Sequence, residues 1–174
     1  QQVYSIEIIG AGEHQTPVAI VPFGGDPKLA AAINDVVVND LLRSGLFRMI
    51  DAEGRSPHEP AEVSYPEWLA RGAEALAIGT VAVQANGRIE ARFRLLDVVK
   101  QAELAGQVVS ASDGQVRAVG HRIADLIYEK LTGDKGVFST RIAYVNRKGQ
   151  HFRLVVADSD GYNEQTVLSQ NQPI

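Results

Sequence analysis

The pattern that comes closest to a metal site lies near the carboxyl end of the chain. Asp158, Asp160 and Gly161 have the opening spacing of a calcium-binding loop. The later oxygen ligands, and the Glu that binds calcium through both of its oxygens, are missing at their places. Aspartate side chains also cap tight turns by accepting backbone hydrogen bonds. The spacing therefore favours a capped β-turn over a calcium site.

Two glycine-rich segments are candidates for binding phosphate. Residues 10–12 begin like a dinucleotide-binding loop, but Gln15 stands where the third glycine belongs, which favours a hinge. Residues 24–25 precede a predicted helix, whose free N–H groups could hold a phosphate. No Lys-Ser/Thr pair follows, and Asp26 places a carboxylate where the phosphate would lie, so we predict a structural turn.

Histidine, serine and cysteine offer no recognisable catalytic or metal-binding pattern. The histidines, His14, His58, His121 and His151, are scattered, and we assign none to a zinc-binding pair with a carboxylate four residues away, so each is interpreted as a surface residue. Ser56 lies outside any nucleophile elbow. The absence of cysteine excludes disulfides, thiolate metal sites and a cysteine nucleophile. We predict no cofactor, no metal and no enzymatic activity.

Composition places the chain among ordinary globular domains. It has 174 residues, of which 45% are apolar, and a net charge of −4 from 17 basic and 21 acidic residues. This charge argues against binding of nucleic acid or anionic membranes, which requires a concentrated basic patch. The longest apolar run, 73–85, is too short and too interrupted to span a bilayer. The first residue is Gln1, which indicates a removed targeting segment or a trimmed chain.

Hydrophobic periodicity and turn residues predict an α/β domain over residues 15–135. A buried strand over 17–23 leads into a helix over 27–44, which Asp26 caps and Gly45 ends. We expect a strand at 46–50, a surface loop at 51–60 and a short helix from Pro66 to Arg71. In that short helix, Trp68 and Leu69 supply the core contact.

The second half of this domain is predicted to be a hairpin, a further strand and a long helix. Strands at 75–84 and 88–98 flank Asn86-Gly87, which favours a type I′ turn. A third strand follows at 101–110. The helix after it is capped by Ser112 or Asp113 and ends at Gly133.

The two ends of the chain differ from this domain. Residues 136–174 predict three short strands, at 141–145, 152–157 and 163–168, with turns at 147–150 and 158–161, too few for an independent core. They suit the truncated start of an all-β domain. Residues 1–14 predict a strand at 3–9 followed by a hinge. The pattern alone favours an edge strand tied into this domain, but such an arm could also leave and join another protein's sheet.

Several segments together resemble the TolB family of the bacterial Tol–Pal envelope system. The stretch from Glu129 to Val145 is the most specific of them. The segments are PVAIVPF at 17–23, NDLLRSGLF at 39–47 with ID at 50–51, ALAIGT at 75–80, YEKLTGDKGVF at 128–138, TRIAYV at 140–145 and DSDGYN at 158–163.

The resemblance implies a periplasmic protein with an N-terminal α/β domain similar to the anticodon-binding fold, followed by a six-bladed β-propeller. It divides this chain into an arm at 1–14, the α/β domain at 15–135 and an incomplete propeller at 136–174. The isolated propeller strands are expected to be disordered or to pair with another copy, because their neighbouring blades are missing.

The resemblance also implies a non-catalytic adaptor that links TolA to Pal, for outer-membrane integrity and constriction at cell division. The propeller binds Pal, which makes the protein peripheral to the outer membrane, and it is exploited by colicins during import. The resemblance further implies that Pal binding retracts the arm that contacts the C-terminal domain of TolA. That arm corresponds here to Val3, Tyr4, Ser5, Ile6, Glu7, Ile8, Ile9, Gly10, Ala11, Gly12, Glu13 and His14.

Two other functional classes were weighed against the adaptor. Related propellers accompany serine peptidases, but such an enzyme needs an α/β-hydrolase domain, which this sequence lacks. Binding of nucleic acid by a fold similar to the anticodon-binding domain is disfavoured by the net negative charge.

Overall fold

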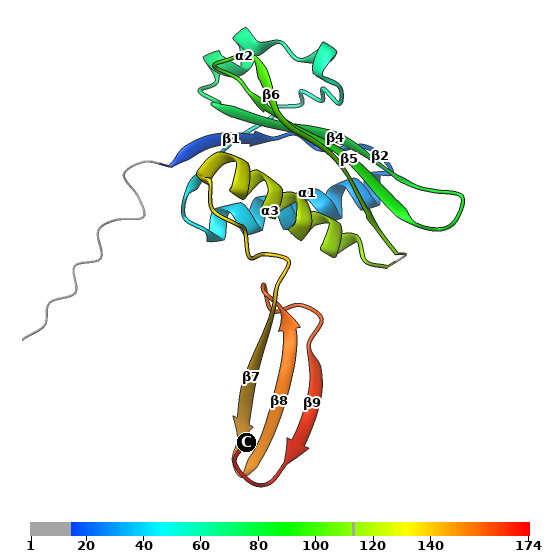
Figure 1. The fold of residues 1–174 in the computed structure, drawn as a ribbon, viewed down its shortest axis with the longest axis vertical. Coiled ribbons are helices and arrows are strands. Elements are labelled where there is room, and N and C mark those ends of the chain that lie inside the picture. Colours follow the sequence, from blue (N-terminus) through cyan, green and yellow to red (C-terminus); the bar gives the residue numbers. More distant parts are fainter. Residues whose placement is uncertain (1–14, 113) are drawn as a thin grey trace, which may run out of the picture.

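The computed structural model describes residues 15–112 and 114–174. They form a mixed α/β domain and a separate three-stranded sheet, which projects from the helical side of that domain (Figure 1). The predicted strand at 3–9 and the hinge after it lie outside the described residues. Within those residues, no helix is long and apolar enough to cross a bilayer.

The sheet of the α/β domain is mixed, with parallel strands on one side and an antiparallel meander on the other. Its order is β3-β1-β4-β5-β6, with β2 as a short extra partner of β4. Strands β1, β3 and β2 run parallel to their neighbours, and β4, β5 and β6 alternate in direction. The strands are β1 (Thr16–Ile20), β2 (Gly24–Gly25), β3 (Phe47–Ile50), β4 (Ala75–Val83), β5 (Ile89–Asp97) and β6 (Ala102–Ala111).

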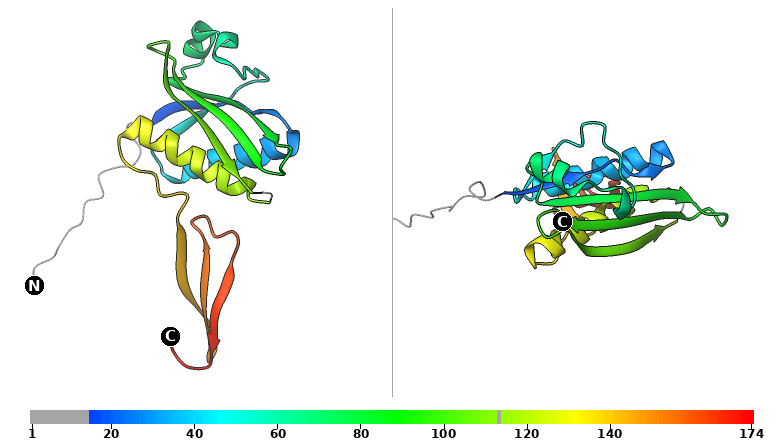
Figure 2. Two further views of the ribbon diagram at one scale, coloured as in Figure 1. Left: turned by 45° about the vertical axis from the view of Figure 1, so that its right-hand side comes forward. Right: turned by 90° about the horizontal axis from the view of Figure 1, so that it is seen from above.

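Helices cover both faces of this sheet. The long helices α1 (Pro27–Arg43) and α3 (Val116–Thr132) lie side by side on one face, and α2 (Tyr65–Ala70) lies on the other (Figures 1 and 2). A 3-10 turn, η1 (Pro60–Glu62), precedes α2. Trp68 of α2 is 2% exposed, which confirms it as the anchor of the smaller core. Leu69 is 53% exposed, so its predicted core contact is wrong.

The larger core lies between the sheet and the two long helices. Ile89, Ala91, Phe93 and Leu95 of β5 point into it, while the residues between them are partly or fully exposed, as their alternation predicts. Apolar side chains on one face of α1, among them Ile33, Val37 and Leu41, pack in the same core. The start of α1 is also as predicted, because the Asp26 carboxylate accepts the N–H groups of Lys28 and Leu29.

Three local features of the α/β domain differ from their predictions. Gly24–Gly25 forms a short strand against β4 rather than a plain turn. The β4–β5 hairpin has the three-residue loop 85–87, closed by the Gly87 N–H on the Gln84 carbonyl. Positive φ occurs at Gly87 but not at Asn86, so this loop is not a type I′ turn. The N-cap of α3 is Gln115, not Ser112 or Asp113, and its side chain makes no capping hydrogen bond.

The second sheet consists of β7 (Arg141–Lys148), β8 (His151–Asp158) and β9 (Gln165–Gln170), all antiparallel. Lys148 pairs with His151, so the β7–β8 connection is tighter than the predicted turn at 147–150. Large apolar side chains of this sheet are exposed, including Ile142, Val145 and Val167. Together they form an exposed apolar surface, of the kind that another layer of structure usually buries.

Gly25 holds β2 against β4 at a position that excludes a side chain. Its φ is +102°, and a Cβ would lie 2.0 Å from the Val81 carbonyl oxygen. Gly54 has a similar φ of +74° but open space around it. We expect Gly25→Ala to lower the free energy of unfolding in urea by about 2 kcal/mol or more, and Gly54→Ala by about 1 kcal/mol. Equal losses would contradict the close approach of β2 and β4.

Candidate functional site

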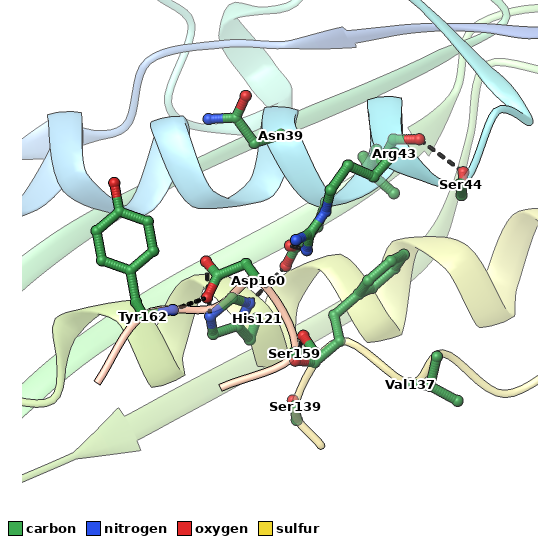
Figure 3. Close-up of polar contacts among 12 residues, drawn as sticks. Asn39, Arg43, Ser44, His121, Val137, Ser139, Ser159, Asp160 and Tyr162 are labelled. Carbon is green, nitrogen blue, oxygen red and sulfur yellow. Dashed lines mark hydrogen bonds and ion pairs between the residues drawn. The ribbon is translucent and has the colours of Figure 1, made fainter. Parts of the chain in front are cut away.

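The partner-binding residues predicted from the sequence, Val3 to His14, all lie outside the described residues. In the part of the chain that the structure does describe, linked ion pairs join five side chains where α1, α3 and the β8–β9 loop meet. We call this group the junction cluster, and Figure 3 labels three of its members, Arg43, His121 and Asp160. Its members are Asp40, Arg43, Arg117, His121 and Asp160.

Close packing of the two long helices positions the centre of this cluster. Gly120 of α3 contacts α1 so closely that a Cβ would lie 2.7 Å from the Cβ of Val36. Asp40 lies beside Val36 and Val37 on the buried stripe of α1, and it is 1% exposed. The neighbouring turn of α3 brings His121, 3% exposed, against it.

Asp40 and His121 form a buried hydrogen bond that joins the two helices. Nδ1 of His121 lies 2.6 Å from Oδ2 of Asp40, and the other oxygen of Asp40 is ion-paired with Arg43. An ionised carboxylate can only accept hydrogen bonds, so Nδ1 must carry the proton. The bond therefore fixes both the tautomer and the orientation of the imidazole.

The opposite edge of the His121 ring faces the second sheet. Nε2 lies 3.6 Å from Oδ2 of Asp160, in the loop after β8, and it has no hydrogen-bond partner. Asp160 is ion-paired with Arg117, whose guanidinium stacks 3.8 Å from the ring centroid of Tyr162. The loop is thus held to α3 by one ion pair and one cation–π contact.

The ionisation of Asp160 is favoured by its surroundings. Burial of the carboxyl acts to raise its pKa. The hydrogen bond from the Tyr162 N–H, followed by the positive charge of Arg117 and by that of protonated His121, outweighs burial and holds the pKa of Asp160 below its ordinary value. The loop therefore presents a charged carboxylate to α3 at neutral pH.

One turn further along α3, Asp125 fixes the linker, residues 133–140, which joins α3 to β7. It is 6% exposed, and its two oxygens accept the N–H groups of Phe138 and Ser139 at 2.7 and 3.1 Å. Ser159 donates its hydroxyl to the Phe138 carbonyl, which ties the β8–β9 loop to the same linker. Phe138 itself packs edge-on against Tyr128 of α3.

A cleft of about 460 Å³ opens beside these contacts. It is bordered by the end of α1, by α3, by the linker and by the β8–β9 loop. Its lining includes the cations Arg43 and Lys135 and the apolar side chains of Tyr128, Val137 and Phe138. Val137 is 63% exposed, so the linker offers apolar surface at the rim.

The cluster is arranged for electrostatic attachment rather than for chemistry on a substrate. One carboxylate oxygen each from Asp40 and Asp160 and one ring nitrogen of His121, all potential metal ligands, lie within 4.8 Å of one another. Both carboxylates, however, are neutralised by guanidinium groups, and we assign no metal there. Among the described residues, no hydroxyl is bonded to Nε2, so the ring activates no nucleophile there.

Two predictions for this region can now be compared with the structure. The interpretation of His121 as a surface residue is wrong, whereas His151 is exposed as expected. Residues 158–161 form the predicted turn, since the Gly161 N–H donates to the Asp158 carbonyl. Asp160 caps it by accepting the Tyr162 N–H, but it also reaches α3, which the turn pattern did not indicate.

The sequence contains spacing signals that indicate the junction cluster. Asp40 interrupts the apolar stripe of α1 at a position that faces the core. Arg117, His121 and Asp125 follow one another at intervals of four residues, which places them on one face of α3. A charged residue on each of two packed apolar faces is a signal for a buried pair.

The Asp125 contact predicts the effect of removing its carboxylate. We expect Asp125→Ala to leave two backbone donors unpaired, to lower the free energy of unfolding in urea by roughly 2 kcal/mol, and to speed protease cleavage in the linker. Asp134→Ala, at an exposed linker position, is the matched control and should change neither. Equal behaviour of the two variants would show that Asp125 does not fix the linker.

The lowered pKa of Asp160 predicts how stability depends on pH. Its ionised form adds stability above the ordinary pKa of an aspartate, and this contribution is lost as the pH falls through the lower pKa of the folded state. The unfolding free energies of the wild type and Asp160→Asn should therefore differ at neutral pH and converge as the pH falls toward about 2. A constant difference across this range would contradict the assigned ion pair.

Comparison with known sequences assigns the chain to a family. The family model described as the TolB amino-terminal domain matches residues 4–104. The chain is 54% identical over its whole length to the Tol-Pal system protein TolB of Nitrosospira multiformis, and 52% identical to that of Dechloromonas aromatica. It spans about two-fifths of these relatives, 40% and 41% of their lengths.

A solved structure agrees with this assignment. The crystal structure of TolB from Acinetobacter baumannii superposes with a TM-score of 0.82 at 34% sequence identity. The match covers 96% of this chain and 42% of that one, so it includes both the mixed α/β domain and the second sheet. On sequence and fold together, the chain belongs to the TolB family of the Tol-Pal system.

Proposed function

We propose that this chain is the N-terminal part of a non-catalytic periplasmic adaptor, which binds the C-terminal domain of TolA through residues 3–14. The observation behind this proposal is the 54% identity over the whole chain with a Tol-Pal system protein. The adaptor maintains the outer membrane and its constriction during division. The net charge of −4 supports protein partners rather than nucleic acid.

The proposed contact with TolA is strand addition. Residues 3–9 are rich in β-branched side chains, which favours an extended segment. Its backbone groups would pair with a sheet edge of TolA, and alternate side chains would give specificity. Ordering the arm on binding costs conformational entropy, so we expect modest affinity.

The rest of the longer protein is proposed to bind Pal and colicins. We propose that β7–β9 begin the predicted β-propeller, whose following blades would cover exposed side chains such as Ile142 and Val145. Most of the Pal surface would then lie outside this chain. Pal would keep the adaptor peripheral to the outer membrane, without insertion.

The position of Gln15 supports coupling between the arm and the junction. Its side-chain amide donates to the Gly45 carbonyl at 3.1 Å. Arg43 and Ser44, which precede Gly45, line the cleft beside the junction cluster. Gly45, which Gln15 contacts, is thus one and two residues from side chains that line the same cleft as Phe138 and Ser159. We propose that Pal binding and arm exposure are linked through this path, in which case each ligand must weaken the other by the same factor.

Calorimetric titration with the C-terminal domain of TolA tests the arm. We expect binding by the whole chain and none by a chain that lacks residues 1–14. Ile6→Pro removes one ladder donor and should weaken binding by roughly tenfold without changing the thermal unfolding of the α/β domain. Ile6→Val keeps that donor and is the matched control. Unchanged binding by the proline variant would contradict strand addition.

A further inference from the structure

The face of α3 that meets the linker and the β8–β9 loop has one unused bonding position. Arg117, His121 and Asp125 are successive members of this face. Arg117 is paired with Asp160, and Asp125 with two backbone N–H groups. His121 is bonded on its α1 side alone, and its Nε2 is buried without a partner. A buried polar atom left in this state is destabilising, and it points to a function.

In its neutral form the ring presents the wrong atom to its neighbour. Because Asp40 accepts the proton on Nδ1, Nε2 of the neutral ring holds a lone pair. That lone pair faces Oδ2 of Asp160 at 3.6 Å, and two acceptors form no hydrogen bond. A proton on Nε2 would convert it into a charged donor directed at a carboxylate, which is among the stronger hydrogen bonds in proteins.

Charged groups flank the ring on both of its nitrogens. Asp40 of α1 lies against Nδ1 and Asp160 of the β8–β9 loop lies opposite Nε2. Arg43 pairs with Asp40 and Arg117 with Asp160, while Asp125, one turn along α3, accepts the N–H groups of Phe138 and Ser139. Tyr162 of the loop stacks on Arg117. A proton on Nε2 would therefore place an imidazolium between two carboxylates, each paired with one guanidinium group.

We propose that His121 is a proton-operated latch between the α/β domain and the second sheet. A proton bound at Nε2 closes a hydrogen bond to Asp160 and tightens the attachment of β7–β9 to α3. The proton is held better when Asp160 is in place, so by linkage the attached arrangement is favoured as the pH falls from about 8 to about 5.5, where histidines ordinarily titrate. At still lower pH Asp160 itself takes up a proton, and the latch opens.

Single-molecule energy transfer measures this attachment directly. The chain has no cysteine, so Lys28→Cys on α1 and Lys148→Cys at the far end of β7 place two dyes on exposed positions of the two units. EDTA is present throughout, so that metal ions cannot bridge the cluster. We expect the distribution of transfer efficiencies to be broad at about pH 8 and to narrow at about pH 5.5.

Three variants in the labelled background separate the latch from other titrations. His121→Gln cannot take up the proton, and Asp160→Asn removes the charged acceptor from a loop outside the core; both should lose the narrowing. His151→Gln, at an exposed position in β8, should keep it. Circular dichroism checks that each variant is folded. If His121→Gln does not fold, Asp160→Asn alone tests the latch. A width independent of pH in the labelled protein, or narrowing that persists in Asp160→Asn, would overturn the proposal.

Discussion

The buried bond between Asp40 and His121 is the constraint on which the junction depends. A carboxylate that is 1% exposed is tolerated in the helical layer only because an imidazole and a guanidinium satisfy its oxygens. The same bond orients α3 about its axis, since Gly120, the residue before His121, touches α1. The opposite edge of His121, with Arg117 and Asp125, is thereby presented to the second sheet.

Through this arrangement the second sheet is attached to the α/β domain at two places. Two backbone N–H groups of the linker donate to the carboxylate of Asp125, and the β8–β9 loop is held by the ion pair between Asp160 and Arg117. Both of these attachments are polar and lie beside a cleft, whereas the α/β domain is held by two apolar cores, one on each face of its sheet. Interfaces of this polar kind allow relative motion more readily than hydrophobic ones. Motion here would reach Arg43 and Ser44, which precede Gly45, the residue that accepts the side-chain amide of Gln15.

Elements with local signals were predictable, and contacts between distant segments were not. The capped start of α1, the alternation in β5 and the left-handed end of α3 at Gly133 follow from residues within one turn or strand. The predicted core contact of Leu69 is wrong because a short helix exposes part of its apolar surface. The predicted type I′ turn at Asn86-Gly87 is wrong because the length of the loop overrides the preference of the dipeptide. The junction cluster joins residues up to 120 positions apart, from Asp40 to Asp160, and no local pattern encodes such a pairing.

The tautomer of His121 is the most direct test of the account. Long-range nitrogen–hydrogen NMR spectra of the histidine rings distinguish a proton on Nδ1 from one on Nε2. The geometry at Asp40 requires the Nδ1–H form at about pH 8, with a proton protected from exchange with water. An Nε2–H tautomer at about pH 8 would contradict the bond to Asp40, and with it the arrangement of α3 toward the second sheet.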